Sequence, residues 1–310
     1  MTDTRRESPD LLWYLAARGV LGSLSLLPLG LSTTICQMLG RLVYRRDVRH
    51  RRIGMTNLRL AFPEKSDEWR TKVLERSYAQ IAGHVAELSR LTRVSGDDIH
   101  RRVNYEPGRG VENYRLARDE GRGVLFLTAH ISSWELLPQA HALRERPLSF
   151  VVRPLDNPYL DGWMTRIRTR FGNRVIPKQG SLREMLRELH RGEAVGLLVD
   201  QNVQEKDGVY APLFGIPACT TSSVALLSMK TGAPVVPAFL VPAESRGRYR
   251  MRFYPPLHAE STGSREQDVI HNTTRFNGFI EAVIREFPHC WLWGHRRFRT
   301  QPDGRDLYGI

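Results

Sequence analysis

A short apolar segment that ends at a histidine constrains the fold more than any other feature of the sequence. Residues 124–129 are apolar or small, and a Gly-Arg-Gly turn signal precedes them. Such a run is typical of a strand that is buried on both faces of a parallel sheet. His130 follows directly, so we expect it at the carboxyl end of the strand, where open α/β sheets bind their ligands.

An acid follows this histidine five positions later. Ser132, Ser133 and Glu135 are typical of the start of a helix, with a hydroxyl at the cap and an acid in the first turn. We expect Glu135 to accept the proton on one imidazole nitrogen of His130, which leaves the other nitrogen to take a proton from a substrate hydroxyl. A structural hydrogen bond is the alternative, because short motifs of this kind also arise by chance.

Strands and helices alternate from this point to the C-terminus. The patterns predict strands at 124–129, 148–153, 173–176, 194–200, 235–242 and 249–253. They predict helices at 134–144, 158–170, 181–191, 221–231 and 268–286. This order predicts an α/β fold with a mainly parallel central sheet flanked by helices.

The N-terminal part of the chain is apolar. Residues 19–40 contain no charged side chain, and Arg18 and Arg41 flank them. The length suits a membrane anchor that spans the bilayer or lies in its interface. A pair of buried core helices and a signal peptide are the alternatives, although no clear cleavage pattern is present. We therefore expect a membrane-associating helical segment at 1–45 and the main domain at 46–310.

Positive charge follows the apolar segment. Seven arginines between Arg41 and Arg59 are opposed by Asp47 alone, so this part carries +6 of the net +13. Such a run binds anionic lipid head groups, at about 1 kcal/mol per charge, and marks the cytoplasmic side of a membrane. A solvated helix face is the alternative. We recognise no nucleic-acid-binding module, which argues against nucleic acid as the anionic partner.

The three cysteines, Cys36, Cys219 and Cys290, are scattered and lack the spacing of metal ligands. A disulfide framework or a zinc site is therefore not expected, and a reducing compartment fits. The sequence also lacks the glycine-rich motifs that bind nucleotides. We expect neither a metal nor a cofactor.

Further polar residues follow the predicted strands. Arg153 ends the strand after His130, and the pair 200–201, Asp-Gln, ends a later one. The pair 220–221, Thr-Thr, precedes a helix whose N-terminus would offer free amides to an anion. A base, an acid, an arginine and a helix N-terminus on one edge suit acyl or phosphoryl transfer to a hydroxyl. The structural alternatives are an Arg153 ion pair with Asp156 or Asp200, and threonines that only cap the helix.

Several blocks together resemble one family. They are His130-Ile-Ser-Ser-Trp-Glu135, residues 153–158, residues 192–201, Phe214-Gly215 with Ala218 and 220–221, residues 232–237, residues 60–64 and Trp291-Leu-Trp293. From about Leu11 to Trp293 the chain resembles the lipid A biosynthesis acyltransferases of the lysophospholipid acyltransferase superfamily. Two departures concern the pocket lining: Ala129 stands where Asn is common, and residues 131–133 replace a common Phe-Gly-Asn.

The resemblance implies an O-acyltransferase at the cytoplasmic face of a bacterial inner membrane. It would move a fatty acyl chain from acyl carrier protein to a hydroxyl of a lipid A precursor, an anionic phosphorylated glycolipid, late in lipopolysaccharide biosynthesis. His130 would act as general base with Glu135 as its orienting acid. The expected substrate-binding residues are Arg153, Lys178, Asp200, Gln201, Gly215, Thr220 and Thr221. A different glycolipid or lysophospholipid acceptor is one alternative, and a non-enzymatic basic protein of membranes or nucleic acid is another.

Overall fold

A seven-stranded sheet forms the centre of the protein in a computed structural model that describes residues 4–108, 110–245 and 247–309. Its strands, in spatial order, are β1 (Val103–Tyr105), β9 (Tyr249–Phe253), β8 (Val235–Pro242), β2 (Val124–Thr128), β5 (Ala194–Leu198), β3 (Ser149–Val152) and β4 (Arg174–Pro177). Among these described strands, each neighbouring pair is parallel except β8 and β9. The predicted α/β fold with a mainly parallel sheet is therefore confirmed.

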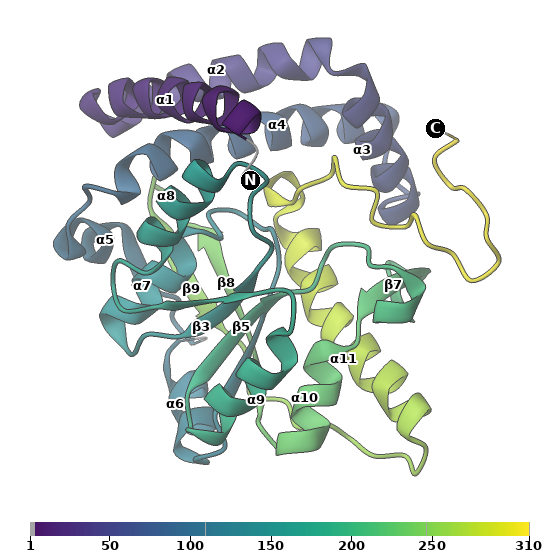
Figure 1. The fold of residues 1–310 in the computed structure, drawn as a ribbon. Coiled ribbons are helices and arrows are strands. Elements are labelled where there is room, and N and C mark those ends of the chain that lie inside the picture. The colour runs from purple at the N-terminus through teal and green to yellow at the C-terminus, as the bar shows by residue number, and fades with distance from the viewer. Residues whose placement is uncertain (1–3, 109, 246, 310) are drawn as a thin grey trace.

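Helices cover both faces of the sheet and one of its ends (Figure 1). They are α1 (Thr4–Leu26), α2 (Leu29–Arg46), α3 (Val48–Ala61), α4 (Asp67–Leu91), α5 (Gly96–Arg102), α6 (Glu112–Asp119), α7 (Leu136–Arg144), α8 (Pro158–Arg168), α9 (Ser181–His190), α10 (Ser223–Thr231) and α11 (Arg265–Glu286). Short 3-10 turns lie at Glu205–Asp207 and Pro288–Cys290. The five helices predicted after residue 124 are all present, with ends that differ by a few residues.

The central strand β2 is buried on both faces, as its unbroken apolar run predicts. Leu125 and Leu127 join a core that includes residues of α9, α10 and α11. Val124 and Phe126 join a second core with residues of α6, α7 and α8. Successive side chains of a strand point to opposite faces, so one strand supplies both cores. Because β2 is buried on both faces, its position in the sheet determines the position of His130 at the carboxyl edge.

A second, two-stranded sheet was not predicted. The strands β6 (Gly208–Leu213) and β7 (Ile216–Thr221) pair in an antiparallel hairpin. Its two turn residues, Phe214 and Gly215, both have positive φ, at 56° and 74°. Such φ values are typical of the two-residue turns that match the twist of a hairpin. Pro212 and Pro217 interrupt the strand pattern, which explains why the sequence indicated only a loop here.

The N-terminal segment forms the helices α1 and α2, which lie against α4 at the end of the sheet (Figure 1). Pro28 separates the two helices. A Cβ at Gly40 would lie 2.6 Å from the carbonyl oxygen of Tyr78, so the missing side chain lets α2 approach α4 closely. None of the described helices is both long enough and apolar enough to cross a membrane. The boundary between residues 45 and 46 stays a prediction.

Two neighbouring strands separate at the carboxyl edge of the sheet. β3 and β5 pair only at Ser149–Val195 and Phe150–Gly196, although both strands continue beyond these pairs. The two strands are therefore separated at the carboxyl edge of the sheet, the same edge at which His130 follows β2. This opening leads into the cavity described next.

Candidate active site

The imidazole of His130 is held by an aspartate that is distant in sequence. Its Nδ1 lies 2.8 Å from Oδ1 of Asp200, and its backbone N–H donates to Oδ2 at 3.0 Å. Asp200 follows β5, the parallel neighbour of β2, so the sheet brings the two residues together. The carboxylate accepts a hydrogen bond from the N–H at Nδ1, which leaves Nε2 as the nitrogen available to a substrate.

The C-terminal part of the chain supports this pair. The indole N–H of Trp291 donates to Oδ2 of Asp200 at 2.8 Å. The same segment also binds the loop after His130: the backbone N–H of Ser132 donates to the carbonyl of Cys290 at 2.9 Å. The carboxylate of Asp200 is 2% exposed, so its hydrogen bonds do not compete with bulk water.

Charge and burial act in opposite directions on the two groups. Burial opposes protonation of His130, but the Asp200 carboxylate outweighs it and raises the pKa of His130 above its ordinary value. Burial also opposes ionisation of Asp200, yet His130 and Trp291 stabilise the carboxylate and lower its pKa. The imidazole is therefore a stronger base than a free histidine.

Glu135 is not the partner of this imidazole, and the expected orienting role is corrected here. Its Oε1 accepts from Nη2 of Arg168 at 2.6 Å and its Oε2 from Nε at 3.1 Å. The expected hydroxyl cap is also absent at this turn. α7 begins at Leu136, and the hydroxyl of Ser133 donates to the buried carboxylate of Glu87 on α4.

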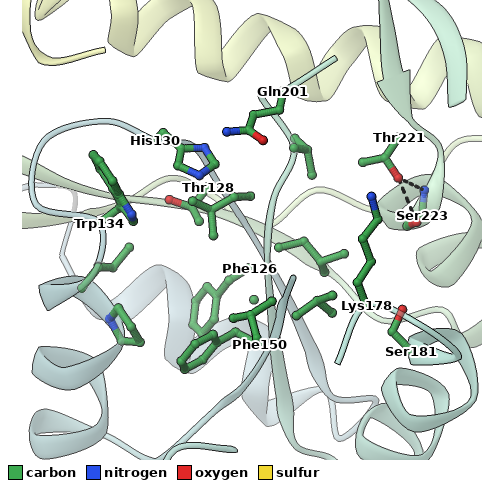
Figure 2. Close-up of a pocket in the computed structure, with 18 of the residues that line it drawn as sticks. Phe126, Thr128, His130, Trp134, Phe150, Lys178, Ser181, Gln201, Thr221 and Ser223 are labelled. Atoms are coloured by element: carbon green, nitrogen blue, oxygen red, sulfur yellow. Dashed lines mark hydrogen bonds between the residues drawn. The ribbon is translucent and has the colours of Figure 1, made fainter. Parts of the chain in front are cut away.

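A cavity of about 720 Å³ opens beside His130. One side of it is polar, and Figure 2 shows the ammonium of Lys178 pointing toward the hydroxyls of Thr221 and Ser223, with His130 and Trp134 on the opposite side. Below them in Figure 2 lie the rings of Phe126 and Phe150. The other lining residues are mostly apolar and include Leu137, Leu148, Leu198, Ala238 and Phe253, together with the buried imidazole of His141. Apart from Leu148, which directly precedes β3, these residues come from β2, β3, β5, β8, β9 and α7, so the cavity enters the sheet where β3 and β5 separate.

Four of the predicted substrate-binding residues line this cavity: Arg153, Lys178, Gln201 and Thr221. Arg153 lies at its exposed margin, where the side chain is 78% exposed and Nη2 lies 3.3 Å from Oδ1 of Asp156. This contact is the ion pair with Asp156 that the sequence analysis gave as a structural alternative for Arg153. Thr221 lies at the end of β7, and its hydroxyl also approaches the first turn of α10.

The other three predicted residues lie elsewhere. Gly215 forms the turn of the β6–β7 hairpin, where it supplies a positive φ. Thr220 is buried and accepts hydrogen bonds from Arg297 and Asn277, so it braces the C-terminal segment and does not cap α10. Asp200 is buried behind His130 and is not among the residues that line the cavity. Its position suits orientation of the base instead of contact with a substrate.

Two residues of the site were missed from sequence. Arg168 lines the cavity and holds Glu135, but it is one of many arginines on a helix and carries no local signal. Trp291 belongs to the Trp291-Leu-Trp293 block that the resemblance singled out, yet nothing in that block indicates its contact with Asp200.

The fold and the site together define a class of protein. A basic histidine lies at the carboxyl edge of a parallel sheet, beside a cavity with a polar mouth and an apolar interior. This arrangement suits an enzyme that activates a hydroxyl next to a long apolar substrate.

Comparison with known proteins agrees with that class. Residues 3–300 match the family described as bacterial lipid A biosynthesis acyltransferase. The lipid A biosynthesis lauroyltransferase of Escherichia coli (strain K12) is 28% identical over 269 residues, which cover 86% of this chain and 84% of that protein. The palmitoleoyltransferase of the same organism is 28% identical over 257 residues, 83% and 81% of the two chains. Its myristoyltransferase is 23% identical over 297 residues, 94% and 90%. The protein belongs to the bacterial lipid A biosynthesis acyltransferase family and is an acyltransferase.

Proposed function

We propose that this acyltransferase moves a fatty acyl chain from acyl carrier protein to a hydroxyl of a phosphorylated lipid A precursor, late in lipopolysaccharide biosynthesis. The observation that carries the proposal is the His130–Asp200 pair at the mouth of a cavity with an apolar interior. The family, and the names of the relatives, supply the acceptor class.

His130 is the general base in this proposal. Nε2 removes the proton of the acceptor hydroxyl while the hydroxyl oxygen attacks the carbonyl carbon of the acyl thioester. The tetrahedral intermediate then expels the carrier's thiolate, which takes the proton from the imidazolium. Asp200 stabilises that imidazolium and keeps Nε2 facing the cavity. Because the acceptor attacks directly, no acyl-enzyme is required. None of the three cysteines is among the residues that line the cavity, and burial raises the pKa of Cys290 to about 12.

The two parts of the cavity suit the two parts of the reaction. The apolar interior would bury the acyl chain, at about 0.8 kcal/mol for each buried methylene. The polar mouth carries Lys178 beside hydroxyl groups, which suits a phosphate of the acceptor. Arg153 at the exposed margin would meet either the acceptor or the acidic carrier protein.

We also propose that α1 and α2 lie in the interface of the inner membrane, at its cytoplasmic face. Leu12 and Trp13 of α1 are 67% and 71% exposed, and Leu39, Leu42 and Val43 of α2 are exposed as well. Exposed arginines follow at the end of α2 and the start of α3. An apolar helix face beside a basic run is typical of helices that lie on anionic membranes.

Mass spectrometry of lipid A tests the proposal. Cells that lack this protein would be complemented with the wild-type chain, His130→Ala or His190→Ala, the last being an exposed histidine on α9 outside the cavity. We expect one additional acyl chain on lipid A with the wild-type and His190→Ala proteins, and none with His130→Ala. Transfer by His130→Ala at the wild-type level would refute the role of His130 as general base. An added acyl chain on another glycolipid, with lipid A unchanged, would refute the lipid A precursor as the acceptor.

A further inference from the structure

One of the cations that line the cavity has no acidic partner among the described residues. Arg153 pairs with Asp156, and Arg168 pairs with Glu135, so an acid balances the charge of each guanidinium. Lys178 forms no ion pair with any residue that the structure describes. An ammonium group without a counter-ion, at the mouth of a cavity, attracts an anionic group of the ligand that enters there.

Two hydroxyl groups lie where this ammonium points, as Figure 2 shows. Oγ1 of Thr221 and Oγ of Ser223 are 2.9 Å apart, and only one of them can donate to the other. The hydroxyl that accepts keeps its own hydrogen, so one O–H of the pair is left for a ligand. Both residues lie at the start of α10, whose first turn contains no acid, so the helix dipole adds partial positive charge.

This set of donors suits a phosphate monoester. Such a group carries a charge of about −1.5 to −2 near pH 7 and offers three acceptor oxygens, so it can bind an ammonium and a hydroxyl together. A phosphodiester carries a single negative charge and attracts the same ammonium less. Asp207 also lines the cavity, so the mouth is not positive throughout, and the donors are confined to the side of Lys178.

We infer that Lys178, Thr221 and Ser223 anchor a phosphate of the acceptor, and that the span from this anchor to His130 selects the hydroxyl that is acylated. The selection deepens the proposed function and rests on it for the identity of the acceptor. The reacting hydroxyl must come within hydrogen-bond reach of Nε2 of His130, which lies on the opposite side of the mouth. Fixing a glycolipid at two points lets only a hydroxyl at the matching separation reach the base.

A cycle that crosses a protein variant with a change of substrate tests the anchor. Wild-type and Lys178→Gln proteins are assayed with the acceptor and with the same acceptor after its phosphates are removed. We expect Lys178→Gln to lower kcat/KM for the phosphorylated acceptor by roughly 10- to 100-fold, as for a lost hydrogen bond to a charged group. With the dephosphorylated acceptor the two proteins should be equal. Lys206→Gln is the matched control, because Lys206 is exposed on the 3-10 turn and does not line the cavity.

The two hydroxyls should contribute to the same phosphate. Thr221→Val/Ser223→Ala should lower kcat/KM for the phosphorylated acceptor by up to roughly 10-fold, since it removes one neutral donor. Its effect should also vanish with the dephosphorylated acceptor. An equal loss with both acceptors, in this variant or in Lys178→Gln, would overturn the anchor.

Tandem mass spectrometry of the products tests the selection. Wild-type protein should acylate one hydroxyl of the phosphorylated acceptor. Lys178→Gln should distribute the acyl chain over more than one hydroxyl, and removal of the acceptor phosphates should have the same effect on the wild-type protein. A single acylated position in both cases would overturn the selection.

The carrier protein offers a second phosphate, the diester of its phosphopantetheine arm. Acyl-phosphopantetheine and acyl-pantetheine, used as donors, separate the two sources. We expect the loss in Lys178→Gln to be the same with both donors. A loss that disappears with acyl-pantetheine would assign the anchor to the donor and overturn the selection.

Binding of inorganic phosphate, followed by phosphorus NMR, needs no turnover. It should be weaker in Lys178→Gln than in Lys206→Gln, and equal binding in the two variants would overturn the anchor. A wild-type protein that transfers no acyl chain would refute the proposed function instead, while the comparison of phosphate binding would still test the anchor.

Discussion

Asp200 accepts hydrogen bonds from both the ring Nδ1 and the backbone N–H of His130, at 2.8 and 3.0 Å. One carboxylate therefore sets the tautomer of the base and also the path of the backbone that carries it. Since the two residues follow neighbouring parallel strands, the register of β2 and β5 determines the geometry of the proposed catalytic pair.

This relationship predicts a pH dependence. Transfer requires a neutral imidazole, so the rate should rise with pH through the raised pKa of His130, which lies above 6.5. Asp200→Asn removes the carboxylate that outweighs burial and leaves only the smaller effect of Glu135 against it, so the rising part of the profile should move to lower pH. The maximal rate should fall by about 10²-fold. Profiles of kcat/KM against pH measure both effects. A rising part that stays in place would contradict the role of Asp200.

The adjacent serines of the catalytic loop should respond in opposite directions to glycine. Ser132 has φ of 54°, and its buried hydroxyl has no partner among the described residues. Ser132→Gly removes both the backbone strain of the positive φ and the unpaired hydroxyl, and should stabilise the fold by about 1 kcal/mol. Ser133→Gly removes the donor to Oε2 of the buried Glu87 carboxylate, whose Oε1 keeps Arg102 and Tyr249, and should destabilise the fold by a similar amount or more. Chemical denaturation measures both, and the same sign for the two variants would refute this interpretation.

The contact of α2 with α4 depends on one glycine. Gly40→Ala would place a Cβ 2.6 Å from the carbonyl oxygen of Tyr78, so the helices must move apart. We expect a loss of about 1–3 kcal/mol in the free energy of unfolding, typical of overpacking. Gly22→Ala in α1 is the matched control, because its Cβ would meet nothing within 4 Å. There alanine should be neutral or stabilising, as its helix propensity predicts.

The length of the transferred chain should depend on Gly196. This residue lines the cavity on β5, and a Cβ there would lie 3.4 Å from Leu148 and 3.6 Å from Phe150, which are ordinary contacts. Added side chains therefore take up cavity volume without straining the strand. Gly196→Ala and Gly196→Leu should progressively favour shorter acyl donors in a competition assay with donors of different length. An unchanged preference for donor length in Gly196→Leu would show that the acyl chain does not lie beside Gly196.

Membrane binding should have an apolar and an electrostatic part. Leu12→Gln/Trp13→Gln should weaken binding to vesicles that contain phosphatidylglycerol at both low and high salt. Leu116→Gln/Leu182→Gln is the matched control, since both leucines are exposed but lie on α6 and α9. Replacing Arg45, Arg46 and Arg49 by serine should weaken binding mainly at low salt, because salt screens exposed charges. Equal loss in the leucine control would argue against a specific interfacial face.

The fold was largely predictable because its signals are local. The apolar run before His130 and the glycine turns around it define β2 without reference to other elements. The pairing inside the site was not predictable in the same way. Glu135 is close to His130 in sequence, whereas Asp200 is close only in space, because β5 lies beside β2. Asp200 was correctly expected at this edge of the sheet, but its bond to the imidazole depends on strand order, which no local pattern specifies.

The hydrogen bond from Trp291 to Asp200 also has a consequence for biosynthesis. At a synthesis rate of about 5–20 residues per second, the 161 residues from Ile131 to Trp291 take roughly ten to thirty seconds to translate. During that interval α1 and α2 have already left the ribosome, while the loop at His130 still lacks its last support. The helices proposed to bind the membrane are therefore available before the proposed active site is complete.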